Sequence, residues 1–94
     1  MYFEWDPAKA RENLKKHRVS FEMAVTVFDD SLHLSIVDSA TAREERWVTI
    51  GLAADKRTLV VVHTYRARRG AEVLRIISAR LATKHERRQY EKGI

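Results

Sequence analysis

The sequence contains no cysteine, one proline and three glycines in 94 residues. Without cysteine it can form no disulfide bond, no thiolate zinc site and no cysteine nucleophile, although this absence does not identify the redox compartment. Three glycines are too few for a glycine-rich phosphate loop, which argues against the use of nucleoside triphosphates. The four histidines show no HExxH spacing and join no dense cluster of acidic residues, so we expect no metal and no cofactor.

Long apolar runs are also missing. No segment approaches the roughly 20 apolar residues of a membrane helix. The opening MYFEWDPAK lacks the basic and then apolar pattern of a secretory signal. No repeat or linker divides the chain, and 45% hydrophobic residues are too many for a disordered one. We therefore expect one soluble domain over residues 1–94, with no membrane contact and the cytoplasm as its compartment.

The positive charge is concentrated in the C-terminal part of the chain. The formal net charge is +5, yet residues 1–55 carry 7 Lys and Arg against 10 Asp and Glu. Residues 56–94 carry 11 against 3. Such a concentration attracts phosphate backbones and favours a nucleic acid as substrate or partner. The alternative is that this charge only keeps a small protein in solution.

The N-terminal third predicts a short strand over 3–5 followed by two helices. An Asp-Pro pair at positions 6 and 7 is typical of a helix start, and this helix should run to about His17. Ser20 can cap a second helix, whose apolar residues follow helical spacing as far as Phe28.

The rest of the chain predicts four strands and a last helix. Apolar residues alternate with polar ones over 32–36 and 47–52, and β-prone runs over 59–66 and 73–80 indicate a hairpin with Gly70 in its turn. The capping-box spacing of Thr83 and Glu86 predicts a helix over 84–92. The order β-α-α-β-β-β-β-α implies an α+β fold, with a mainly antiparallel sheet and helices on one side.

Five segments, in order, resemble the BrnT toxins: FEWDPAKARENLKKH, VSFEMAVTVFDD, EERWVTIG, VVVHTYR and LRIISARLATKHERRQYE. Together they cover roughly residues 3–91. The resemblance implies a cytoplasmic ribonuclease toxin of a type II toxin-antitoxin system, with a fold similar to RelE toxins. It also implies a ribbon-helix-helix antitoxin, BrnA-like, that neutralises the toxin. The pair would repress their shared promoter, so promoter DNA would be met only through the antitoxin complex.

One position departs from the family pattern. The family usually has glycine after the Lys-His pair, and Arg18 stands there in this chain. If the turn between the helices still needs a left-handed residue, arginine costs about 1 to 2 kcal/mol. The alternative is a turn of different shape.

Three arginines on the predicted hairpin suit the stabilisation of a reacting phosphate. RNA can be cut without metal if a base removes the 2′-OH proton, cations neutralise the phosphorane and an acid protonates the leaving oxygen. Guanidinium groups stay charged and donate paired hydrogen bonds to phosphate, which makes Arg66, Arg75 and Arg80 catalytic candidates. They are otherwise solvent-facing arginines. The loop length does not fix the strand register, so the sequence leaves open which of them share a face.

Two histidines are candidate proton carriers. His63 and Tyr65 have the same parity on one strand, so they point to one side, where histidine could exchange protons and tyrosine could stack on a base. Because Leu59 and Val61 share that parity, the alternative places both side chains at the margin of the core. His17 ends the first helix, where it is either catalytic or a cap that complements the helix dipole.

The last helix adds further basic residues. Lys84, Arg87 and Arg88 could form an RNA-binding surface, or simply a solvated outer face. The composite hypothesis is an endoribonuclease that inhibits translation and growth. The alternatives are a non-catalytic module that binds nucleic acid, and one that only binds an antitoxin.

Overall fold

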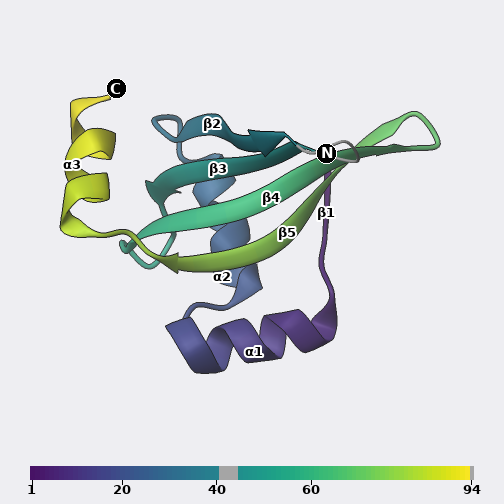
Figure 1. Cartoon of the computed structure of the whole chain (residues 1–94), viewed down its shortest axis with the longest axis horizontal. Coiled ribbons are helices and arrows are strands. Elements are labelled where there is room, and N and C mark those ends of the chain that lie inside the picture. The colour runs from purple at the N-terminus through teal and green to yellow at the C-terminus, as the bar shows by residue number, and fades with distance from the viewer. Residues whose placement is uncertain (41–44, 94) are drawn as a thin grey trace.

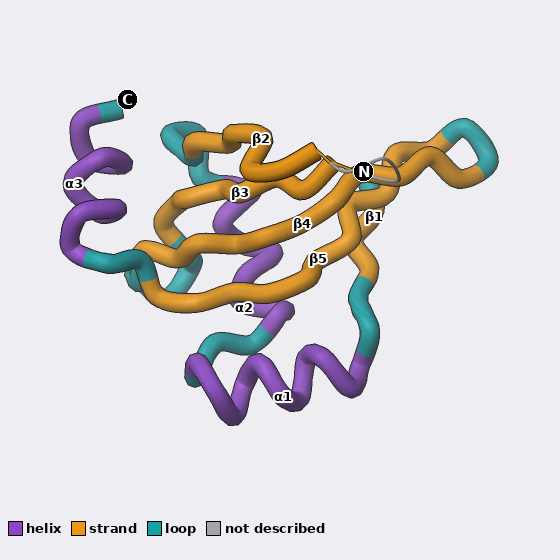
Figure 2. Tube along the Cα trace, in the orientation of Figure 1, coloured by secondary structure: helices purple, strands orange, loops and turns teal. Residues whose placement is uncertain are grey.

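The computed structural model describes residues 1–40 and 45–93. A five-stranded sheet dominates it, and the helices lie against the sheet (Figures 1 and 2). The elements are, in chain order, β1 (Tyr2–Glu4), α1 (Pro7–His17), α2 (Phe21–Val25), the 3-10 helix η1 (Thr26–Asp29), β2 (Leu34–Ala40), β3 (Glu45–Leu52), β4 (Thr58–Arg68), β5 (Ala71–Leu81) and α3 (Lys84–Lys92). Within the described residues, no helix is long and apolar enough to cross a membrane.

The sheet is mixed, with the strand order β1-β5-β4-β3-β2. Strands β2 to β5 pair antiparallel along the chain, as the sequence predicts. β1 instead pairs parallel with β5, through Tyr2↔Val73 to Glu4↔Arg75. The expectation of a mainly antiparallel sheet therefore holds for four strands and misses the parallel edge. Hydrophobic periodicity reports the faces of a strand and not its neighbour in space, so this pairing was not visible in the sequence.

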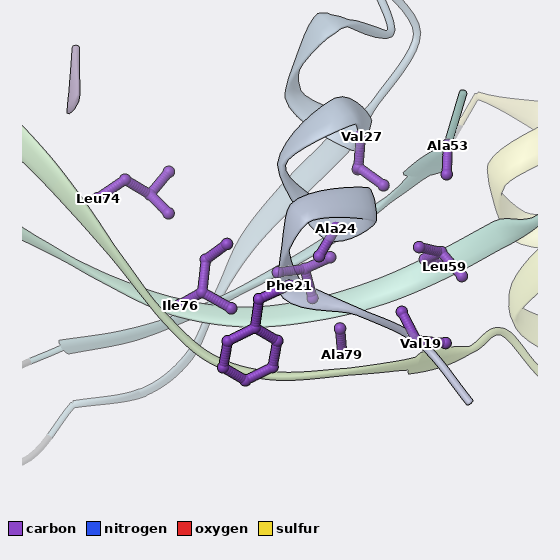
Figure 3. Packing of buried hydrophobic residues seen from close by; sticks show 10 residues of the cluster. Val19, Phe21, Ala24, Val27, Ala53, Leu59, Leu74, Ile76 and Ala79 are labelled. Carbon is purple, nitrogen blue, oxygen red and sulfur yellow. The ribbon is translucent and has the colours of Figure 1, made fainter. Parts of the chain in front are cut away.

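The helices do not all lie on one side of the sheet, which corrects the prediction that they do. α1, α2 and η1 pack on the face that holds the apolar core (Figure 3). That core consists of Val19, Phe21, Ala24, Val27, Ala53, Leu59, Val61, Leu74, Ile76 and Ala79. Gln89 of α3 borders a groove formed by Ile50 and its neighbours, which point to the opposite face. In Figure 1 α3 stands at one end of the sheet, away from α1 and α2.

Two elements differ in extent from their predicted ranges. The second helix tightens into η1 after Val25, where the Thr26 hydroxyl donates to the Met23 carbonyl oxygen at 2.6 Å and bends the chain. The following strand begins at Leu34 and not at Leu32. Leu32 lies in a turn, where its amide donates to the Asp30 carboxylate. Its side chain is 70% exposed and does not join the strand.

Asn13 fastens α1 to the edge of β5. β1 pairs only with residues 73–75, and beyond them the buried Asn13 amide takes the place of a neighbouring strand. Asn13 Nδ2 donates to the Ala79 carbonyl at 2.8 Å, and the Ala79 amide donates back to Oδ1 at 3.1 Å. Nδ2 also donates to the Val19 carbonyl at 2.9 Å. These bonds fix the distance between α1 and the edge strand.

The turn after α1 keeps its left-handed residue. Arg18 has φ 59° and ψ 30°, and its amide donates to the Leu14 carbonyl oxygen. The turn has therefore not changed shape to suit arginine. The strain considered for this position falls on Arg18.

A β-bulge interrupts the pairing of β4 with β5. Val62 is opposite Ser78, but His63 is opposite Ile76, so Ile77 is an extra residue in β5. The bulge changes the parity of β5: residues before and after it that would otherwise point to opposite faces now share one face. This controls the arrangement of the candidate site.

Candidate active site

The register brings all three predicted arginines to one face of the sheet. Arg75 is opposite Thr64, and Arg80 is opposite Val60. Positions 60, 64 and 66 of β4 have the same parity, so Arg66 shares this face with Arg75 and Arg80. Arg75 and Arg80 are five residues apart and would point to opposite faces of a regular strand. The bulge at Ile77 unites them, which the sequence did not reveal.

Arg80 is held by a carboxylate from α3. Its Nη1 and Nη2 atoms donate to Glu86 Oε1 and Oε2 at 2.8 and 2.9 Å. This paired hydrogen bond raises the pKa of Arg80 and lowers the pKa of Glu86 to about 2. Glu86 Oε1 also accepts from the Thr83 amide, which completes the capping box of α3. The first turn of α3 thus orients Arg80.

Arg75 is held by a carboxylate from the neighbouring strand β1, through a single hydrogen bond. Its Nη1 donates to Glu4 Oε2 at 2.9 Å, and the second oxygen of Glu4 lies 3.0 Å from Nη1 of Arg68. Arg68 lies on the same face, two residues beyond Arg66. We call the surface formed by Arg66, Arg68, Arg75 and Arg80 the arginine face.

A cleft beside β5 contains His17. Its volume is about 260 Å³, and it is lined by Lys9, Glu12, Asn13, Lys16, His17, Ile77 and Ser78. We call it the α1 cleft. His17 is half-buried at the end of α1, with Lys16 and Glu12 beside it in the lining. Ser78 belongs both to this cleft and to the strand face of Arg80, because it is opposite Val62. The α1 cleft therefore meets the arginine face at the bulge.

His63 lies in the interior and not at the margin of the core. Its ring is 0% exposed, and Nε2 is 2.7 Å from the Thr49 hydroxyl, which is 2.6 Å from the Ser35 hydroxyl. The Phe28 ring packs edge-on against it, with centroids 5.0 Å apart. Burial lowers the pKa of His63 to about 4, which keeps the ring neutral at pH 7. Because the ring has no exposed surface, its position argues against contact with a phosphate.

Tyr65 points away from the arginine face. It shares the side of His63, as its parity predicts, and the two ring centroids are 5.2 Å apart. Trp47 packs edge-on against Tyr65 at 5.6 Å. Tyr65 is 37% exposed, and burial raises its phenol pKa. A base stacked on Tyr65 would therefore lie on the opposite side of the sheet from the three arginines.

The basic residues of α3 are on its solvent side. Lys84, Arg87 and Arg88 are all exposed. The inner side of α3 carries Tyr90, whose hydroxyl donates to the Asp30 carboxylate and whose pKa rises to about 12 as a result. This bond fixes α3 against the turn before β2. The exposed side of α3 is left available to a ligand.

Sequence analysis missed the acidic members of the site. Glu4 and Glu86 each pair with an arginine of the site, and Glu12 lines the α1 cleft. Glu86 was recognised as a capping residue, but a second partner for its carboxylate cannot be read from spacing. Within residues 1–40 and 45–93, no three His, Cys, Asp or Glu side chains gather closely enough to hold a metal ion.

The fold and site define a class: a small α+β domain that presents arginines on an open sheet face beside a histidine-containing cleft. The family model for the ribonuclease toxin BrnT of type II toxin-antitoxin systems matches residues 5–86. The chain belongs to this BrnT family, which confirms the resemblance found in the sequence.

A solved structure gives the same result. The chain is similar to the 1.1 Å crystal structure of the Brucella abortus ribonuclease toxin BrnT, with a TM-score of 0.57 and 25% identity. The match covers 89% of this chain and 99% of the Brucella chain. The search of curated proteins gives no match.

Proposed function

We propose that this BrnT toxin is an endoribonuclease that cleaves RNA without a metal ion, by attack of a 2′-OH on the adjacent phosphate. The observation that carries the proposal is that Arg66, Arg75 and Arg80 share one sheet face and that this face meets the α1 cleft at Ser78. Such a reaction needs positive charge at the phosphorane and proton carriers on either side of it. The arginine face provides the charge, and the cleft contains His17.

The carboxylates make the arginines better suited to this task. A guanidinium has five N–H donors, and Glu86 uses only part of the set on Arg80. The remaining donors can bind phosphate oxygens while the pair with Glu86 keeps the guanidinium in place. Glu4 does the same for Arg75. Fixed donors lose little side-chain entropy on binding and are effective in stabilising a transition state.

His17 is the better proton carrier of the two predicted histidines. It lines an open cleft, whereas His63 has no exposed surface. The carboxylate of Glu12 lies in the same cleft. Lys16, in the same cleft, adds a positive charge near the phosphate from which the 5′-oxygen leaves. We assign general acid-base catalysis to His17 and a supporting role to Glu12.

The remaining basic surface would guide RNA to the site. Lys84, Arg87 and Arg88 form an exposed approach on α3, and Tyr65 can contact a nucleotide that passes around the sheet. Cleavage of messenger RNA would stop translation and growth. A type II system implies an antitoxin, and we propose the ribbon-helix-helix class, which would bring the complex to promoter DNA.

Induced expression with paired variants tests this function. Wild type should arrest growth and fragment RNA, whereas Arg80→Lys, which keeps the charge but loses the paired geometry, should do neither. Arg11→Lys is the control, because Arg11 is an exposed residue of α1 outside the lining of the α1 cleft. Folding is checked by circular dichroism on purified proteins. Growth arrest with intact RNA would favour binding without cleavage, and an active Arg80→Lys would remove Arg80 from the mechanism.

A further inference from the structure

The end of the β4–β5 hairpin projects beyond the rest of the sheet. β3 pairs with β4 only as far as His63, and β1 pairs with β5 only from Val73 to Arg75. Among the described strands, residues 66–72 pair only across the β4–β5 hairpin, Arg66 with Val73 and residues 67–68 with 71–72, and in Figures 1 and 2 this ribbon extends past its neighbours. A two-stranded ribbon without flanking strands has both edges accessible to a ligand.

The projecting ribbon is rich in arginine, and one of these arginines, Arg68, pairs with Glu4. It carries Arg66, Arg68 and Arg69, with Glu72 as its one acidic residue. All three arginines are exposed residues, and Ala67 and Gly70 between them add no apolar side chain that a core would need. Neither core packing nor the reaction at Arg75 and Arg80 accounts for arginine at the tip.

The tip arginine occupies a costly backbone position. Arg69 has φ 51° and Gly70 has φ 78°, and they form a two-residue turn closed by the pair Arg68↔Ala71. Turns with two positive φ values favour Asn-Gly or Asp-Gly, because asparagine and aspartate tolerate the left-handed region. Arginine there is strained, and strained residues concentrate at functional sites, which points to a role of this guanidinium in binding a ligand at the tip.

The arginine face is too long for one phosphate. From Val60, opposite Arg80, to Arg68 is eight residues of β4, or about 26 Å at roughly 3.3 Å per residue. A stacked strand advances about 3.4 Å per nucleotide, so this length matches about eight nucleotides. Arg80 and the ribbon tip can therefore contact the same RNA only if it extends well beyond the scissile phosphate.

We propose that the ribbon of residues 66–72 is a second RNA-binding site, in which Arg68 and Arg69 hold the phosphates of nucleotides that flank the cleavage point. This proposal rests on the proposed function in taking RNA as the ligand, but it concerns binding and not the chemical step. Two-stranded basic ribbons fit the phosphate backbone by charge and need no base contact. The site selects for the length of the RNA and not its sequence.

The test measures affinity for uncleavable 2′-O-methyl RNA of 4 and 16 nucleotides. The double variant Arg68→Gln and Arg69→Asn removes two charges, and asparagine suits the left-handed turn. Loss of two phosphate contacts should weaken 16-mer binding about tenfold and lower the salt slope, log Kd against log salt, by about 1.4. Binding of the 4-mer should stay within a factor of two of wild type.

The control double variant Arg11→Gln and Lys15→Gln removes the same charge from exposed positions of α1. Its 16-mer affinity should remain close to wild type. Equal weakening by both double variants, or equal weakening of the 4-mer and the 16-mer, would overturn the site. A loss confined to a 24-base-pair DNA duplex would overturn RNA as its ligand. If wild type binds with this length dependence but cleaves nothing, the ribbon site stands and the proposed function fails.

Discussion

The two faces of the sheet at β4 and β5 place ionisable side chains in opposite environments. One face lies under α1, α2 and η1, and there His63 is kept neutral by burial against Phe28. The other carries the arginine face, whose guanidinium groups keep their charge beside Glu4 and Glu86. Residues adjacent in sequence therefore have different chemistry. The helical layer, and not the residue type, decides which side chain can meet a substrate.

The two candidate histidines follow the same division. His63 has the buried position and His17 borders the open α1 cleft. Substitution of each histidine, with activity and stability measured separately, tests this difference between His17 and His63.

Replacement of His17 by glutamine should lower the rate of RNA cleavage by about 10² to 10⁴, as for loss of a general acid or base. The variant should also lose one limb of the pH-rate profile, which a merely structural histidine would not cause. Lys15→Gln, at an exposed position of α1 that is not part of the cleft lining, is the matched control and should keep both. A fully active His17→Gln would show that a residue other than His17 transfers the proton.

Replacement of Asn13 by alanine should destabilise the fold by about 3 to 4 kcal/mol, because the Ala79 amide and carbonyl and the Val19 carbonyl lose their buried partner. Urea denaturation measures this change. The exposed neighbour Lys15→Ala should change stability by less than about 0.5 kcal/mol. A small effect at Asn13 would mean that α1 is held to β5 by packing alone.

Wild type should lose up to about 3 kcal/mol of stability as the pH falls from 6.5 to 4, because the unfolded chain takes up a proton on His63 first. The contribution is complete above pH 6.5, the unfolded pKa, and is lost towards the lowered folded pKa of about 4. His63→Phe should lack this part of the pH dependence in urea titrations while it retains RNA cleavage. Loss of activity in a folded His63→Phe would break the division between the two faces.

Replacement of Arg18 by glycine should stabilise the protein by about 0.5 to 1 kcal/mol, because glycine adopts φ 59° without strain. Thermal melting of the two proteins measures the difference. The bond from Arg57 to the backbone carbonyl of residue 18 is unaffected. A destabilised glycine variant would show that the Arg18 side chain has contacts worth more than the strain.

Local signals in the sequence predicted most of the elements. The Asp-Pro start of α1, the capping box at Thr83 and the strand predicted for β3 each depend on neighbouring residues, and each is confirmed. The alternation in β3 did not identify its buried side, because Thr49 is buried and Leu52 is exposed. The parallel pairing of β1 with β5 and the place of α3 depend on contacts between distant residues, so no local pattern predicted them.

The same distinction applies to the candidate site. Residue type and strand position identified Arg66, Arg75 and Arg80 as candidates, but only the bulge at Ile77 places them on one face. A single extra residue in a strand leaves hydrophobic periodicity almost unchanged. Likewise, parity paired His63 with Tyr65 correctly, and the depth of His63 depended on Phe28, which comes from another part of the chain.

Cleavage of a defined RNA by purified protein in the presence of EDTA tests whether the arginine face cuts RNA without a metal ion. The substrate carries one ribonucleotide within a 2′-O-methyl strand, which limits attack to one phosphate. We predict that wild type leaves a 2′,3′-cyclic phosphate and a free 5′-OH. Arg75→Lys and Arg80→Lys should each lower the cleavage rate by about 10² or more. Unchanged rates in both folded variants, or cleavage that requires a divalent metal, would contradict a metal-independent reaction on the arginine face.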